Sequence, residues 1–102
     1  MNTDEPKKEL LTLLAEIQEM QGFYSISSSN KLNGIYTKYK IITKQLSNNG
    51  LSVAFNAATE FNQIETRLNF AINGTPKKEA SSSYIIARQN IKDDIEFILS
   101  SL

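Results

Sequence analysis

Apolar residues recur every three or four positions over much of this chain, which is the spacing of an amphipathic helix. The clearest example predicts a helix over residues 4–21, with Thr3 placed to cap it, Pro6 in its first turn and Gly22 at its end. Its apolar stripe consists of Leu10, Leu13, Leu14, Ile17 and Met20. Leu11 falls outside that stripe, so a helix here exposes it to solvent.

Residues 23–30 are rich in serine and are expected to form a polar connector, although Phe23 and Tyr24 predict that it packs against the rest of the chain. The segment after it, residues 31–50, has the periodicity of a helix and leaves Ile41 off the apolar stripe. The stripe consists of Leu32, Ile35, Tyr36, Tyr39, Ile42 and Leu46. The same segment is rich in β-branched and aromatic residues, which suits a strand, but the helical pattern is favoured.

Residues 51–73 carry two periodicities at once. Alternation of apolar and polar residues predicts strands over 51–61 and 64–72, joined by a turn at Asn62-Gln63, which is a poor pair for a tight hairpin. No glycine or proline interrupts the segment, and this favours one helix roughly 33 Å long. In that helix Phe55 and Phe70 lie on the polar side. The Asn-Gly pairs at 49–50 and 73–74 would then be left-handed caps of helices.

The last element is predicted to be a helix over residues 90–101, with an extension back to Ser82. Residues 84–88, YIIAR, also suit an edge strand, and the stretch before them, NGTPKKEASSS, is expected to be a loop. The helical stripe consists of Tyr84, Ala87, Ile91, Ile95, Ile98 and Leu102.

These elements predict a single small globular domain over residues 1–102, of the all-α class, folded as an antiparallel four-helix bundle. The alternative is an α+β fold, in which the two terminal helices pack on an antiparallel β-meander built from residues 23–88. The choice between helix and strand in that central region decides which side chains are exposed.

Composition removes most catalytic chemistry. The chain contains neither cysteine nor histidine, which excludes disulfides, zinc-thiolate sites, histidine-ligated metals and imidazole bases. We therefore expect no enzyme activity, no metal and no cofactor. Eleven basic and eleven acidic residues cancel, and no apolar run is long enough to cross a membrane or resembles a secretory signal. These features predict a cytoplasmic protein that binds no nucleic acid and does not insert into membranes.

Two charged groups are candidates for chemistry, and both have a simpler interpretation. Lys38, Lys40 and Lys44 form a basic strip, which a helix would turn toward water. Asp93, Asp94 and Glu96 lie on the last predicted helix and are expected to form a solvated face. Asp94 borders the apolar stripe, so it is a candidate to pair with a cation on a neighbouring helix.

The most informative residues are apolar side chains that fall off the stripes, namely Phe55, Phe70, Ile41 and Leu11. Exposed apolar clusters often mark contacts with a partner. We expect a non-enzymatic interaction module that binds another protein, a second copy of this chain included. In size and in its lack of catalytic groups the chain is similar to small helical immunity proteins, which protect bacteria against their own bacteriocins, and this is the alternative. A small-ligand or nucleic-acid binding domain remains a further alternative.

Overall fold

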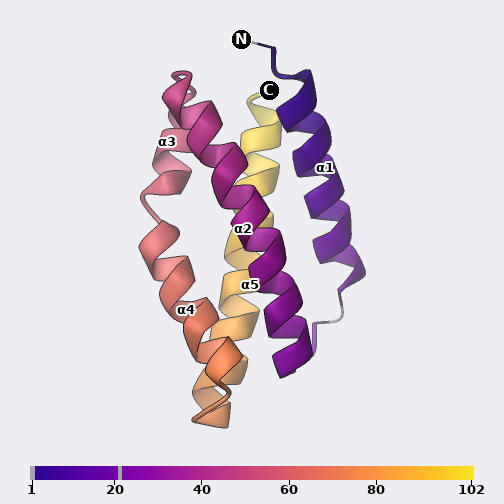
Figure 1. The fold of residues 1–102 in the computed structure, drawn as a ribbon, viewed down its shortest axis with the longest axis vertical. Coiled ribbons are helices and arrows are strands. Elements are labelled where there is room, and N and C mark those ends of the chain that lie inside the picture. The colour runs from indigo at the N-terminus through magenta and orange to yellow at the C-terminus, as the bar shows by residue number, and fades with distance from the viewer. Residues whose placement is uncertain (1, 21) are drawn as a thin grey trace.

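The computed structural model describes residues 2–20 and 22–102, and over these residues it contains five α-helices and no strand. They are α1 (Asp4–Glu19), α2 (Ile26–Asn48), α3 (Ser52–Ala58), α4 (Phe61–Asn73) and α5 (Lys77–Ser100). Figure 1 shows α1 running downward, α2 upward, α3 and α4 downward one after the other, and α5 upward behind α2. The fold is all-α with bundle-like packing, and the α+β alternative is wrong.

The first helix ends close to the position that the sequence predicts. Its last residue is Glu19, and position 21, the predicted end, lies outside the described residues. Thr3 makes no side-chain cap; instead the Asn2 side chain accepts a hydrogen bond from the Asp4 amide at 2.9 Å. At the other end, the Arg88 guanidinium reaches from α5 and donates to carbonyl oxygens of the last turn, those of Ile17 (3.0 Å) and Met20 (3.3 Å). This contact satisfies acceptors that a helix end leaves free.

The expected polar connector is largely helical. The second helix already begins at Ile26, because the Ser25 hydroxyl caps it by accepting a hydrogen bond from the Ser28 amide at 2.9 Å. The serine-rich stretch is therefore a capping sequence and the first turn of α2. Phe23 does not pack back onto the body as expected and is largely exposed, whereas Tyr24 does.

The single helix expected over residues 51–73 is divided into α3 and α4 at Thr59–Glu60. The amides of Thr59 and Glu60 donate to the carbonyls of Asn56 (3.2 Å) and Ala57 (3.1 Å), three residues back. The Thr59 hydroxyl also donates to the Asn56 carbonyl at 2.6 Å. A threonine side chain readily makes such a local bond to the backbone, which competes with helical bonding, and α3 ends here.

The final helix begins earlier than predicted. It starts at Lys77, so most of the stretch expected to be a loop, together with the candidate edge strand YIIAR, forms its first three turns. Pro76 occupies the N-cap position, and its carbonyl accepts the Ala80 amide at 3.0 Å. Ala80 is buried completely, which helps to hold this first turn on the bundle.

The predicted stripes form one hydrophobic core. Every predicted stripe residue of α2 is buried, and at its centre Phe61 meets the rings of Tyr36 and Tyr39 edge to face, with 6.1 Å between centroids in both pairs. Such edge-to-face pairs add to the free energy gained from burial. Ala54 and Ala57 are buried where α3 packs against α2, as expected for small residues that allow close approach.

Two features fix the turn between α4 and α5. Gly74 ends α4 with φ 75°, the left-handed conformation expected of the Asn-Gly pair, and Gly50 after α2 likewise has φ 91°. The Tyr24 hydroxyl donates to the Ala71 carbonyl near the end of α4 at 2.9 Å, and its ring meets Tyr84 of α5 with centroids 6.0 Å apart. Tyr24 thus joins the segment between α1 and α2 to both later helices.

Replacing Tyr24 with phenylalanine should lower the free energy of unfolding by about 1 kcal/mol, because it removes the hydroxyl hydrogen bond and keeps the ring contact. Urea unfolding followed by circular dichroism measures the change. Phe23→Leu, next to it on the exposed side, is the matched control and should leave stability unchanged. Equal stability of Tyr24→Phe and the parent protein would contradict this role of the hydroxyl.

Candidate functional site

The four apolar residues expected to lie off the stripes are all exposed in the structure. The exposed fraction is 41% for Phe70, 50% for Leu11, 55% for Ile41 and 63% for Phe55. Leu11 belongs to α1, Ile41 to α2, Phe55 to α3 and Phe70 to α4. The structure thus places each of these side chains on the side of its helix that the periodicity predicted.

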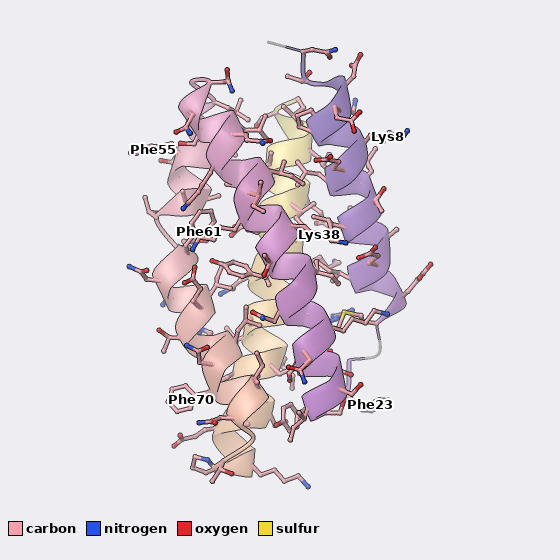
Figure 2. All side chains as sticks on the ribbon, viewed as in Figure 1. Lys8, Phe23, Lys38, Phe55, Phe61 and Phe70 are labelled. Atoms are coloured by element: carbon pink, nitrogen blue, oxygen red, sulfur yellow. The ribbon has the colours of Figure 1, made fainter. Side chains whose placement is uncertain are left out.

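The four residues do not form one patch. Figure 2 shows Phe55 and Phe70 projecting outward from the edge formed by α3 and α4, one near each end of the molecule. Ile41 instead lines a groove between α1 and α2, and Leu11 is not among the residues of that groove. Ile41 therefore lies in the α1–α2 groove, whereas Phe55 and Phe70 lie apart from it and from each other on the α3–α4 edge.

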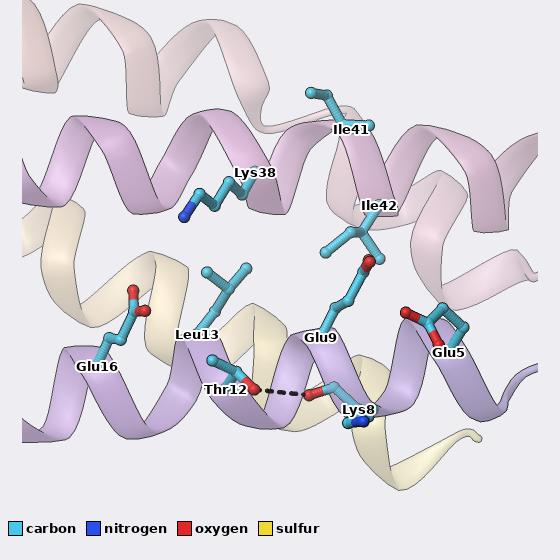
Figure 3. A pocket seen from close by; sticks show the side chains of 9 residues that line it. All are labelled: Glu5, Lys8, Glu9, Thr12, Leu13, Glu16, Lys38, Ile41 and Ile42. Carbon is cyan, nitrogen blue, oxygen red and sulfur yellow. Dashed lines mark hydrogen bonds between the residues drawn. The ribbon is translucent and has the colours of Figure 1, made fainter.

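The α1–α2 groove has a volume of about 430 Å³. Figure 3 shows Leu13 and Ile42 pointing toward one another across it, with Glu9 beside Ile42 and Lys38 reaching along it on the side of Glu16. The remaining lining residues are Glu5, Lys8, Thr12 and Ile41. The groove thus has an apolar floor and a charged rim.

A second hollow, of about 300 Å³, lies between α3 and α5, and we call it the α3–α5 groove. It is lined by Val53, Asn56, Ala57, Glu60, Asp94 and Phe97. Phe55 lies on the opposite side of α3, because residues 53, 56, 57 and 60 share one face of the helical path and residue 55 does not.

The expectation that Asp94 pairs with a cation is wrong. Its carboxylate accepts a hydrogen bond from the Tyr39 hydroxyl of α2 at 3.4 Å, and Glu60 lines the same α3–α5 groove. Burial, followed by the Glu60 carboxyl, raises the pKa of Asp94 to about 7, while the Tyr39 bond opposes the shift. The sequence missed this pair because Glu60 stands 34 positions before Asp94, at the break between α3 and α4.

The basic strip does not act as a single solvated face. Lys38 and Lys44 are exposed as expected, but Lys40 is half-buried and forms an ion pair with Glu65 of α4, with 2.7 Å between Nζ and Oε2. Its ammonium also lies 5.5 Å from the centre of the Phe61 ring. The strip therefore contributes to the packing of α2 on α4 at its middle position.

Glu65 receives a second hydrogen bond, from the hydroxyl of Tyr36. The bonds from Lys40 and Tyr36 hold the pKa of Glu65 below its usual range, whereas burial raises the pKa of Tyr36. Glu65 is thus ionised and bonded on its α2 side, which is the arrangement of a structural ion pair and not of a general base.

Sequence reasoning missed other exposed apolar residues. Phe97 on α5 is exposed, as are Ile85 and Ile86 of the same helix and Phe23 before α2. For α5 the helical periodicity could have identified them. A stripe through Tyr84, Ala87 and Ile91 leaves Ile85, Ile86 and Phe97 outside it. Ile85 and Ile86 were missed because the start of α5 was expected to be a loop or a strand, whereas Phe97 lies in the part of α5 that was predicted to be helical.

Over the described residues, no group of three or more acidic side chains could hold a metal ion. Within the same part of the chain, none of the helices combines the length and the hydropathy needed to cross a membrane. Comparisons with protein families, with curated proteins and with solved structures give no match to this chain. Its own surfaces are therefore the basis for assigning a function.

Replacing Glu65 with glutamine should lower the free energy of unfolding at neutral pH by about 1 kcal/mol. The effect is no larger because solvent screens the partly exposed ion pair of Glu65 with Lys40. Because folding lowers the pKa of Glu65, its ionised form adds stability above the unfolded-state pKa, and this stability is lost as the pH falls through the folded-state pKa. The difference between variant and parent should therefore vanish in acid.

Chemical unfolding at neutral and acidic pH measures this dependence. Glu96→Gln is the matched control, since Glu96 pairs with Lys92 at 3.3 Å within α5, and this exposed pair should contribute only a few tenths of a kcal/mol. A Glu65→Gln effect that is the same at both pH values would contradict the ionised role of Glu65.

Proposed function

We propose that this protein is a non-enzymatic interaction module that binds another protein through its exposed phenylalanine side chains. The observation that carries the proposal is the distribution of the aromatic residues. Four of the five phenylalanines are exposed, namely Phe23, Phe55, Phe70 and Phe97, and only Phe61 is buried. Of the four tyrosines, three are buried and Tyr24 is half-buried.

This distribution reverses the usual preference. A buried tyrosine needs a partner for its hydroxyl, whereas phenylalanine is buried without that requirement. Each exposed phenylalanine forgoes about 2 kcal/mol that burial of its ring would provide. A partner that covers these rings recovers that free energy, and aromatic residues are among those enriched at the centres of protein interfaces.

The arrangement supports an elongated contact along the edge formed by α3 and α4. Phe55 and Phe70 both project from this edge, near its two ends (Figure 2). The bundle extends 44 Å along its longest axis, so a partner that covers both rings spans much of its length. Both side chains are exposed and lie outside the hydrophobic core, so their substitution leaves the core intact.

The double substitution Phe55→Ser with Phe70→Ser should leave the helical circular dichroism spectrum unchanged and should abolish association. Sedimentation velocity measures self-association of the purified chain. For other partners, a photo-crosslinking phenylalanine analogue at position 55 or 70, expressed in the source organism, should trap a specific adduct.

The same analogue at Thr66, an exposed polar position of α4, is the matched control and should trap none. Association of the double variant at the strength of the parent, or equal adducts at all three positions, would contradict the proposal.

A second candidate is a bacteriocin-type immunity protein, and the all-α bundle favours it because that class is helical and works by binding without chemistry. Expression in bacteria sensitive to a panel of bacteriocins should then protect against one of them, and the double phenylalanine variant should protect less. Growth inhibition unchanged across the panel would contradict this role while leaving the general interaction role in place.

A further inference from the structure

The α3–α5 groove combines apolar side chains with a carboxyl group from each of its two sides. Val53 and Ala57 line it from α3, and Phe97 lines it from α5. Glu60, which directly follows the break after α3, contributes one carboxyl, and Asp94 on α5 contributes the other. Residues three or four positions apart are neighbours on a helix surface, so these side chains share one face of each helix. The groove is therefore an acidic recess with apolar walls.

The charge of this groove has a single sign. Among the described residues that line it, the charged ones are Glu60 and Asp94, and both are acidic. Neither carboxyl belongs to an ion pair found within residues 2–20 and 22–102. The α1–α2 groove differs, because lysines as well as glutamates line it. Charge complementarity therefore specifies a cationic occupant for the α3–α5 groove, whereas it specifies none for the α1–α2 groove.

The carboxyl groups keep hydrogen-bonding capacity for an occupant. An ionised carboxylate accepts several hydrogen bonds through its two oxygens. Asp94 is half-buried and accepts a bond from the Tyr39 hydroxyl at the long distance of 3.4 Å, while Glu60 is exposed. Partial burial removes water from an ionised carboxylate, and a cation that donates hydrogen bonds to it offsets that loss. A cationic side chain placed in the groove thus meets acceptors from two sides.

The aromatic wall of the groove favours arginine over lysine as this cation. Phe97 lines the groove, and yet 68% of its surface is exposed. The planar guanidinium of arginine stacks on an aromatic face, and its five N–H donors form a fixed fork that can bond to carboxylates on both sides. Lysine offers a compact ammonium without this geometry. The volume of about 300 Å³ is small for a cofactor and suits one long side chain.

We propose that the α3–α5 groove receives an arginine side chain of a partner protein, with the guanidinium against Glu60 and Asp94 and the methylene stem against Val53 and Phe97. Because the occupant is part of a protein, this arginine site rests on the proposed function and names the chemistry that the partner presents. Apolar walls flank the carboxyl groups, so the partner residues next to the arginine are apolar. The carboxyl groups reject a partner with an acidic side chain at that position.

A phage-displayed library of random peptides, selected on the immobilised protein, tests the arginine site without knowledge of the natural partner. Enriched peptides should contain an arginine next to apolar residues. A synthetic peptide of that sequence should bind at least about tenfold more weakly when citrulline, which is neutral and of similar shape, replaces the arginine. Fluorescence anisotropy measures the affinities at about pH 8, above the raised pKa of Asp94, so that this carboxyl is ionised.

Substitutions in the protein then identify the carboxyl groups. Asp94→Asn and Glu60→Gln should each weaken binding of the arginine peptide about tenfold and should leave binding of the citrulline peptide nearly unchanged. Asp93→Asn is the matched control, since it removes the same charge from an exposed neighbouring position that does not line the groove, and it should keep the affinity. Circular dichroism checks that each variant is helical.

A reversal of charge gives a second test that does not depend on Asp94. Glu60 is exposed, so Glu60→Lys should keep the fold. This variant should bind the peptide with glutamate in place of arginine more tightly than the parent protein does, because the charges are again opposite.

Three results would overturn the arginine site: selected peptides that lack arginine, a citrulline peptide that binds as tightly as the arginine peptide, or an equal loss of affinity in Asp93→Asn and Asp94→Asn. The proposed function is tested separately. Phe55 and Phe70 lie outside the α3–α5 groove, so the double variant Phe55→Ser with Phe70→Ser should bind the short arginine peptide as the parent does, whatever becomes of its association with a whole partner.

Discussion

The structure depends on the burial of two adjacent tyrosine rings of α2 whose hydroxyl groups must still find acceptors. Phe61 covers the rings of Tyr36 and Tyr39, and the hydroxyls reach carboxylates on two different helices, Glu65 of α4 and Asp94 of α5. Because a buried hydroxyl without a partner costs free energy, these rings determine where α4 and α5 lie against α2. The bonds from Lys40 and Tyr36 lower the pKa of Glu65, whereas burial, followed by the Glu60 carboxyl, raises the pKa of Asp94 although the Tyr39 bond opposes that shift.

Filling the core with tyrosine leaves the phenylalanines on the surface, and this links the packing to the proposed function. The exposed rings of Phe55 and Phe70 contribute nothing to the core, while the polar groups of the core are largely satisfied by one another. A partner that covers these exposed rings would recover the free energy of burying them. The α3–α5 groove, which Val53, Ala57 and Phe97 line, lies on the other side of α3 from Phe55.

The sequence predicted the helical stripes well because burial follows the helical period closely. Every stripe residue expected in α2 is buried, and all four expected off-stripe residues are exposed. The break at Thr59–Glu60 was not predictable from periodicity, since residues 54, 57, 61 and 64 stay in phase across it, and only local hydrogen bonds of Asn56 and Thr59 end α3. The Glu60–Asp94 pair was missed for a related reason: it joins residues far apart in the chain, and which carboxyls line the same groove depends on how α3 and α5 pack.

The most direct test of these electrostatics is a nuclear magnetic resonance titration of the side-chain carboxyl carbon of Asp94 in the parent protein. We expect Asp94 to titrate with a midpoint near 7 and to shift downward in Glu60→Gln, because the neighbouring charge is then removed. A midpoint of Asp94 near the ordinary aspartate value of 3.8 would contradict this account of how Asp94 is buried between α2, α3 and α5.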